Sequence, residues 1–245
     1  MKCEPSTINW RLKEVYKQNN AKINKQLDEV AHIQQHKKKD KITFYDLSDY
    51  QLGIFWGIGS YVKEEDAVTF KDRRKHFVKI MESITDSNMY EQITSKGKIQ
   101  YVLKSCMFDI NSFILNGWTE RKAKVRDIPP LEEYNDFLRA YIELHSSLDY
   151  SIRYSRNKKN KWKSLRFRIY GNWQLIDSVN NILNTNIGVT LKTPQKASNE
   201  VTKILNYTSL KEIENIFNWL TDNREYHNEY WDDVDIKLKN PTKEM

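Results

Sequence analysis

The chain has 245 residues, of which 39% are hydrophobic and 30% charged, and its formal net charge is +7. This length supports one large domain or two duplicated halves, and the composition excludes wholesale disorder, collagen-like repeats and disulfide scaffolds. No uncharged apolar run reaches the roughly 18 residues of a membrane span, and the first residues lack the apolar stretch of a signal peptide. With only Cys3 and Cys106 as thiols, we expect a soluble, cytoplasmic protein that does not contact membranes.

Residues 1–46 are expected to form a helical arm that ends in a basic linker. Thr7 is placed to cap a first helix, and the spacing of Ile23, Leu27 and Val30 indicates a second one. Two short helices in a basic arm are compatible with part of a helix-turn-helix. Because a third helix is missing, a helical hairpin that docks on the rest of the chain is the favoured interpretation.

Residues 47–125 predict the order helix, strand, strand, helix, strand, strand, helix. Ser48 and Gln51 have the spacing of a capping box that opens the first helix, and the turn at 95–98 is typical of a strand hairpin. The elements are expected at 49–58 (helix), 61–70 (a short hairpin), 72–84 (helix), 89–94 and 99–103 (strands) and 108–115 (helix).

Residues 126–222 repeat this order after a linker at 126–130, and residues 223–245 remain as a C-terminal tail. Aligning Gly59 with Ser146 gives an internal offset of 87 residues, which predicts a diverged duplication. A second capping box is expected at Ser209 and Glu212. The elements are expected at 136–145 (helix), 147–155 and 165–170 (strands), 173–185 (helix), 189–192 and 201–205 (strands) and 210–222 (helix).

Two segments at equivalent places in the halves resemble one known motif. Residues 51–60 read QLGIFWGIGS, which resembles the LAGLIDADG motif of one group of homing endonucleases, and residues 137–147 read FLRAYIELHSS, similar to that family's other common form. Supporting matches are RDIP at 126–129, RIYG at 168–171 and IFNWL at 216–220. The resemblance covers about residues 47–222.

The resemblance implies an α+β fold of two αββαββα repeats related by a pseudo-twofold axis, so that a single chain acts as a monomer. In that family the two motif helices pack together at the axis, and small residues at Gly53, Gly57 and Ala140 allow the backbones to approach closely. Each half contributes an antiparallel saddle sheet that lies in the major groove of double-stranded DNA.

The same resemblance bears on catalysis. The family places one carboxylate at the C-terminal end of each motif helix to hold divalent ions, usually Mg²⁺, against the scissile phosphates. The matching positions here are Ile58, which has no donor atom, and His145, whose imidazole is a poor Mg²⁺ ligand. Glu143 is a weak substitute because it lies about 200° around the helix. We therefore expect no catalytic residues, metal site or cofactor.

A basic block at 150–170 carries eight cations and no acid. On alternating strands Arg153, Arg166 and Arg168 would share one face and read guanine, while the lysines of the turn lie near phosphates. The alternative for this block is a solvated basic hairpin. The candidate DNA-binding residues are Arg153, Arg156, Lys158, Lys159, Lys161, Trp162, Lys163, Arg166 and Arg168 in the second half, and Lys71, Arg73 and Arg74 in the first.

The equivalent hairpin of the first half carries Glu64, Glu65 and Asp66, which would repel phosphates. Either this half contacts DNA elsewhere, or it binds a protein partner through the acidic hairpin Glu64–Asp66 or the N-terminal arm. The remaining landmarks are expected to be core residues: Trp56, Trp118, Trp173, Trp219 and Cys106.

These patterns lead to the hypothesis of a sequence-specific double-stranded DNA-binding protein, derived from a homing endonuclease that lost its catalytic carboxylates. Its expected role is transcriptional regulation in a phage or other mobile element. Two alternatives stay open: a divergent endonuclease with unorthodox ligands, which would require Mg²⁺, and a protein-interaction module.

Overall fold

The first of two similar halves begins at Ile42 in the computed structural model. This structure describes residues 40–120, 125–154, 157, 161–197, 201–222 and 229–243. The two helices predicted for the N-terminal arm lie outside the described residues. The segment Ile42–Met245 forms one structural unit.

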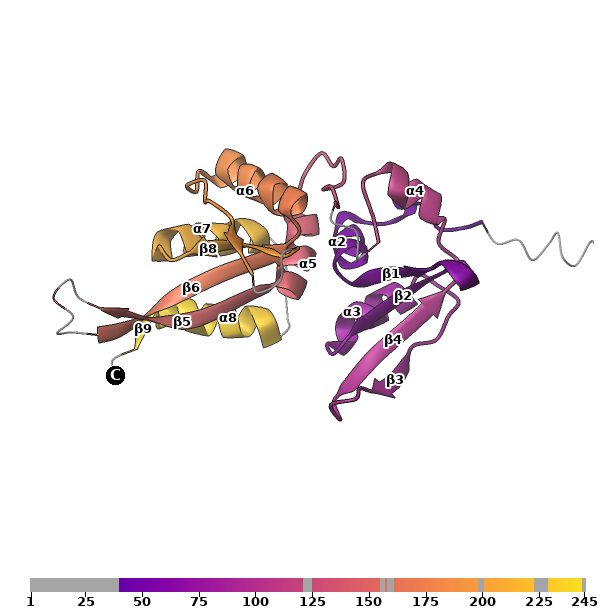
Figure 1. Ribbon diagram of the computed structural model, residues 1–245, viewed down its shortest axis with the longest axis horizontal. Helices are drawn as coiled ribbons and strands as arrows, with labels where there is room; N and C mark the ends of the chain where they lie inside the picture. Colours follow the sequence, from indigo (N-terminus) through magenta and orange to yellow (C-terminus); the bar gives the residue numbers. More distant parts are fainter. Residues whose placement is uncertain are drawn as a thin grey trace, which may run out of the picture. The chain divides into compact units, whose positions relative to one another are not determined.

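The first half follows the predicted element order (Figure 1). Its four strands form one antiparallel sheet in the order β1-β2-β4-β3. The elements are η1 (Phe44–Asp46), α2 (Asp49–Ile58), β1 (Gly59–Val62), η2 (Lys63–Glu65), β2 (Ala67–Asp72), α3 (Lys75–Glu82), β3 (Tyr90–Ile93), β4 (Ile99–Ser105) and α4 (Ile110–Leu115).

The second half repeats the pattern, except that the strand predicted at 189–192 is wrong and the edge strand lies at Gln195–Lys196. Its main sheet has the equivalent strand order β5-β6-β8-β7, and β1 and β5 begin at Gly59 and Ser146, the two residues that the sequence offset aligned. The predicted duplicated α+β fold is thus confirmed. The elements are α5 (Asn135–His145), β5 (Ser146–Tyr154), β6 (Lys161–Gly171), α6 (Trp173–Ile187), β7 (Gln195–Lys196), β8 (Lys203–Tyr207) and α7 (Leu210–Thr221).

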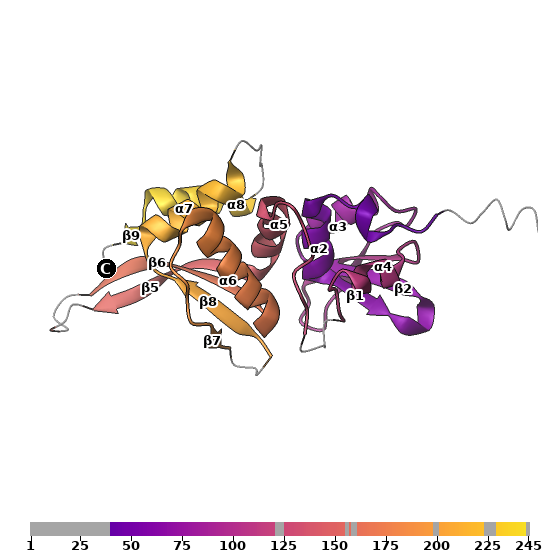
Figure 2. The same ribbon diagram turned by 90° about the horizontal axis from the view of Figure 1, so that it is seen from above.

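The segment predicted as a C-terminal tail is instead part of the second half. It forms α8 (Glu229–Lys239) and β9 (Thr242–Lys243), and β9 pairs with β6. Trp231 and Val234 of α8 are buried, and the Trp231 ring lies 5.7 Å from that of Phe217 in α7. Figure 2 shows α7 and α8 side by side. Burial of these apolar side chains holds α8 against the second half.

Of the two capping boxes predicted from the sequence, one forms and the other does not. The capping box of α2 is confirmed, because the Ser48 hydroxyl accepts from the Gln51 amide and the Gln51 side chain accepts from the Ser48 amide. The predicted box at Ser209 is wrong. The carboxylate of Glu212 instead accepts hydrogen bonds from Lys192 Nζ at 2.8 Å and from the Thr190 amide at 2.9 Å. A charged partner from another segment replaces the local cap.

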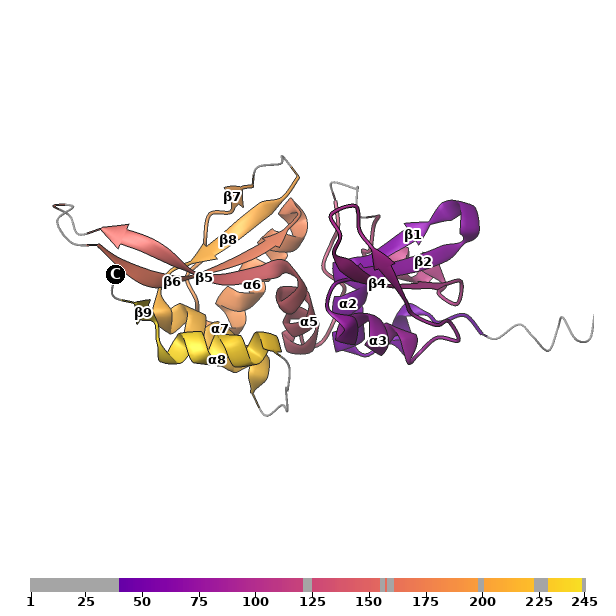
Figure 3. The ribbon, with the colours of Figure 1, turned by 90° about the horizontal axis from the view of Figure 1, so that it is seen from below.

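Each sheet buries one face under helices and leaves the other face mostly polar. Figure 3 shows α7 and α8 on one side of β5, β6 and β8, and α3 in the same relation to the first sheet. The covered faces hold Phe70 and Leu103 in the first half and Phe167 and Ile169 in the second, all fully buried. Because side chains alternate along a strand, every second residue lies on the uncovered face.

The core contains most of the aromatic residues expected there, with two corrections among the landmarks. Trp56 and Trp118 are fully buried, but 51% of Trp173 is exposed. Trp173 is the first residue of α6, and its ring lies 5.9 Å from Lys203 Nζ, so it packs against a polar side chain. Cys106 is also exposed, because it follows the end of β4.

Helices α2 and α5 join the two halves through a close backbone contact. A Cβ atom at Gly53 would lie 2.4 Å from the Phe137 carbonyl oxygen and 2.7 Å from Ala140 Cβ. A Cβ atom at Gly57 would lie 2.5 Å from Leu144 Cδ1. Real Cβ atoms do not approach neighbours so closely, so glycine at position 53, which faces backbone, permits the observed helix separation, whereas at position 57 the Leu144 side chain could shift to make room.

We predict that Gly53→Ala destabilises the protein by about 1–3 kcal/mol, because the added methyl group collides with the α5 backbone. Helix propensity alone predicts the opposite sign, since alanine is favoured over glycine by about 1 kcal/mol. Urea unfolding measures the difference. Asn218→Ala, on the exposed side of α7, is the control and should leave stability within about 0.5 kcal/mol. Stabilisation by Gly53→Ala would contradict the contact.

Candidate nucleic-acid interface

The uncovered face of the long β5–β6 hairpin gathers most of the arginines predicted to bind DNA. The register pairs Arg153 with Trp162, Asp149 with Arg166 and Ser147 with Arg168. Directly opposite residues share a face, and so do alternate residues along each strand. Arg153, Trp162, Arg166 and Arg168 therefore all lie on the face opposite the buried Phe167.

Asp149 lies at the centre of this face and joins two of the arginines. Arg166 donates from Nε to Oδ1 at 2.9 Å and from Nη2 to Oδ2 at 3.1 Å, and Arg168 donates from Nη2 to Oδ2 at 2.5 Å. Partial burial raises the pKa of Asp149, but the hydrogen bonds and charges of both arginines outweigh it and hold this pKa below its ordinary value. The carboxylate is therefore ionised at neutral pH.

Sequence reasoning missed Asp149. The acid-free block begins at residue 150, one position after this carboxylate. The strand register could have revealed the pairing, because an acid at 149 in β5 faces 166 when the hairpin closes between 154 and 161. Among its described residues, the uncovered face of the β5–β6 hairpin thus carries three arginines and one acid. It is less basic than the sequence predicts.

The rest of this face is polar and partly exposed. Arg153 Nε donates to the Ser164 hydroxyl at 3.3 Å, and the guanidinium of Arg168 lies 5.7 Å from the centre of the Tyr170 ring. Trp162 is 40% exposed at the distal end of β6. An exposed indole beside an arginine is able to stack on a nucleobase or on a sugar.

The predicted lysines of this hairpin do not share that face. Lys161 lies opposite Tyr154 and Lys163 opposite Ile152, so both lie on the side of the sheet that faces the helices. The odd-numbered positions of β6 carry its buried apolar residues, and the two lysines continue that series beyond the core. Three further candidates, Arg156, Lys158 and Lys159, lie outside the described residues.

In the first half, Lys71 is exposed on the uncovered face of β2. The acidic hairpin is less negative than its sequence suggests, because Glu65 forms an ion pair with Lys104 of β4. The Asp66 carboxylate accepts from the Tyr61 hydroxyl at 3.0 Å. The ion pair with Lys104 therefore neutralises part of the negative charge that would repel phosphates.

Arg74, predicted to contact DNA, is engaged inside the protein. It donates to the Glu143 carbonyl at 2.5 Å and to the Leu144 carbonyl at 3.4 Å, and its Nε donates to Asp72 at 2.9 Å. These carbonyl groups end α5, where the helix dipole favours a cation. Arg74 thus links the first half to the second, which leaves Arg73, exposed and adjacent, as the freer cation of the pair.

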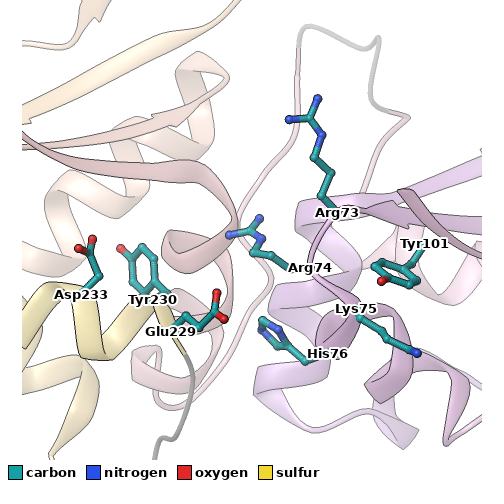
Figure 4. Close-up of a pocket in the computed structure, with 8 residues that line it drawn as sticks. All are labelled: Arg73, Arg74, Lys75, His76, Tyr101, Glu229, Tyr230 and Asp233. Atoms are coloured by element: carbon teal, nitrogen blue, oxygen red, sulfur yellow. The ribbon is translucent and has the colours of Figure 1, made fainter. Parts of the chain in front are cut away.

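A cavity of about 630 Å³ lies beside this link. Figure 4 shows Arg74 directed toward α5, with Arg73 pointing elsewhere and with Glu229, Tyr230 and Asp233 of α8 on the opposite wall. Cations thus line one wall and carboxylates the other. This mixed charge does not select an anionic ligand such as a phosphate.

The two positions that correspond to the catalytic carboxylates lie at the C-terminal ends of the helix pair. Ile58 is 6% exposed and belongs to the hydrophobic core. His145 Nε2 lies 2.8 Å from the Gly57 carbonyl oxygen, and its ring packs 4.8 Å from that of Tyr141. His145 therefore crosses from α5 to the end of α2 and uses one ring nitrogen in that contact.

Glu143 is enclosed between four helices. Its side chain has no exposed surface, and its carboxylate accepts from Trp231 Nε1 at 3.0 Å and from the Tyr50 hydroxyl at 3.4 Å. His76 Nε2 lies 3.0 Å from its other oxygen. Burial and the Glu143 charge raise the pKa of Tyr50 well above its ordinary value, which keeps its hydroxyl a donor. A carboxylate in this position cannot reach a phosphate outside.

Within the described ranges, no group of three or more His, Cys, Asp and Glu side chains is placed to hold a metal ion. Over the same residues, no helix has the length and apolar character required to cross a membrane.

Solved structures of LAGLIDADG homing endonucleases superpose on this chain. I-LtrWI, bound to its target DNA, matches with a TM-score of 0.52 and 15% identity over 78% of this chain and 88% of its own. I-CpaMI, bound to uncleaved DNA, matches with 0.54 and 13% over 79% and 90%. I-SmaMI, bound to an uncleaved DNA target with calcium ions, matches with 0.52 and 12% over 79% and 92%.

No protein-family model matches the sequence, and no curated protein matches it either. The structural likeness nevertheless establishes the architecture, because it extends over both halves at a TM-score above 0.5. This chain has the LAGLIDADG homing-endonuclease fold, as the motif resemblance implied.

We predict that Glu143→Ala destabilises the protein by about 3 kcal/mol or more, since it leaves the Tyr50 hydroxyl and the Trp231 Nε1 group without their acceptor in the protein interior. Glu143→Gln keeps one acceptor oxygen and should cost less. Urea unfolding is the measurement, and Glu133→Ala, an exposed carboxylate before α5, should change stability by no more than about 0.5 kcal/mol. Equal stability of Glu143→Ala and Glu133→Ala would rule out the buried network.

Proposed function

We propose that this protein binds specific sequences of double-stranded DNA and does not cleave them, and that it regulates transcription in a phage or other mobile element. The observation that carries the proposal is the cluster of Arg153, Arg166 and Arg168 on the uncovered face of β5 and β6. The fold adds support, since I-LtrWI and I-CpaMI are both described as bound to DNA.

The hairpin has dimensions suited to this role. The major groove of B-DNA is about 12 Å wide and admits a two-stranded β-ribbon, whose alternate side chains then meet base edges. Strands β5 and β6 have 9 and 11 residues, long enough to cross the groove. A net charge of +7 favours association with a polyanion.

The absence of cleavage is proposed from the chemistry at Ile58, His145 and Glu143. A hard divalent cation prefers charged oxygen ligands, yet Ile58 is buried hydrocarbon, His145 is bound to the Gly57 carbonyl and Glu143 is enclosed. The divergent endonuclease remains the alternative, and its requirement for Mg²⁺ makes it testable. A protein-interaction module is the third outcome.

Removing one exposed cation from each sheet should weaken DNA binding without regard to sequence. We predict that Lys71→Ala with Arg153→Ala lowers the affinity for every duplex and reduces the slope of log K against log salt concentration, by about 0.9 for each phosphate that the variant no longer neutralises. Fluorescence anisotropy over a salt series measures both. Lys211→Ala with Lys239→Ala removes two exposed cations from α7 and α8, and should leave the slope unchanged. Equal effects of the two double variants would argue against the interface.

Cleavage and target choice can be tested together. When the protein is incubated with sheared genomic DNA and Mg²⁺, we expect a small set of fragments to be retained, with no new ends on sequencing, and with the retained sites next to promoters. Discrete new ends would establish the endonuclease instead. Retention of nothing above background at low salt would favour a protein partner.

A further inference from the structure

We infer that Asp149 is a positioning residue that determines base specificity, because it fixes the Arg166 guanidinium with its outer edge free to bind one guanine. This inference rests on the proposed DNA-binding function and extends it to a residue that no basic-patch argument would select. Asp149 carries the wrong charge for DNA, and it nevertheless lies between the two arginines of the face.

The donors that Asp149 occupies leave a defined set available on Arg166. Its carboxylate accepts from Nε at 2.9 Å and from Nη2 at 3.1 Å, side-on along the guanidinium plane. A guanidinium carries N–H donors on all three nitrogens. The end formed by Nη1 and the second hydrogen of Nη2 is therefore unoccupied by Asp149. Two adjacent donors match the N7 and O6 acceptors that guanine presents in the major groove.

Arg168 holds the carboxylate from the other side. Its Nη2 donates to the same Oδ2 atom at 2.5 Å, and its guanidinium lies near the Tyr170 ring. Asp149 is thus restrained by Arg168 while it restrains Arg166. A side chain already fixed in its binding geometry loses less conformational freedom when it meets its target, which favours the one base that fits this geometry.

General affinity for DNA does not account for the acid, and folding stability accounts for it only in part. The side chains of Asp149 and Arg166 are 38% and 31% exposed, so solvent screens their attraction, and even a bidentate pair with this exposure contributes to stability only modestly. A negative charge on the face also weakens attraction to phosphates. The pair does provide a fixed direction for the Arg166 guanidinium. That direction matters for hydrogen bonds to one base and not for contacts with the DNA phosphates.

The test compares discrimination at one base pair with overall affinity. Binding sites are selected from a pool of random duplexes with the wild type, and the selected duplex is then remade with 7-deazaguanine, which lacks N7, at each guanine in turn. For wild type we expect one position at which this replacement lowers affinity about tenfold. For Asp149→Asn the loss at that position should fall to about twofold or less, with affinity for random duplex equal or higher.

Two further variants separate positioning from charge and folding. Asp235→Asn removes an equally negative side chain from α8, where it pairs with Lys239, and should keep the wild-type discrimination. Arg166→Lys should lose it as Asp149→Asn does, because an ammonium group cannot present two fixed coplanar donors. Thermal unfolding of all variants confirms that each is folded.

The possible outcomes distinguish a failure of the Asp149 inference from a failure of the proposed DNA-binding function. If the wild type selects a sequence and Asp149→Asn keeps the full tenfold sensitivity, the role of Asp149 is overturned while DNA binding stands. A selected sequence in which no guanine is sensitive to 7-deaza replacement has the same consequence. If the wild type selects no duplex at all, the proposed function fails and the inference falls with it.

Discussion

The close contact of α2 with α5 at Gly53 is the constraint on which the rest of the structure depends. Each of these helices leads without a connecting loop into the first strand of its own sheet, α2 into β1 at Gly59 and α5 into β5 at Ser146. The spacing of the helix pair therefore fixes where both sheets begin. A side chain at Gly53 would meet the α5 backbone, separate the helices and move the two sheets apart with them.

The polar groups around this contact are satisfied within the protein. Arg74 closes the C-terminal end of α5, His145 reaches the end of α2, and Glu143 receives donors from α2 and α8. Buried charges are costly unless they are paired in this way. The end of the helix pair thus connects the two halves, and the charges that we propose to bind DNA lie farther out along the second sheet.

The duplication is unequal, and the inequality has a physical basis. Strands β5 and β6 are more than twice and nearly twice as long as β1 and β2, and α8 with β9 supports the second half alone. The first half ends its hairpin in acids, of which Glu65 is neutralised by Lys104. The second half is therefore the better candidate for reading the DNA sequence in the proposed function.

The sequence by itself determined the duplication and most elements of the two repeats, because apolar periodicity and the Ser48 capping box act over a few residues and are visible in any short window. It did not reveal α8 and β9, which depend on contacts with α7 and β6. The tertiary structure alone decided which charges are available. Arg74 finds carbonyl groups about 70 positions away, Arg166 finds Asp149 across a hairpin, and Glu212 leaves its cap for Lys192. Such partners are brought together by the folded chain and are far apart in sequence, so no short window of sequence reveals them, although the hydrogen bonds to these charged groups are strong.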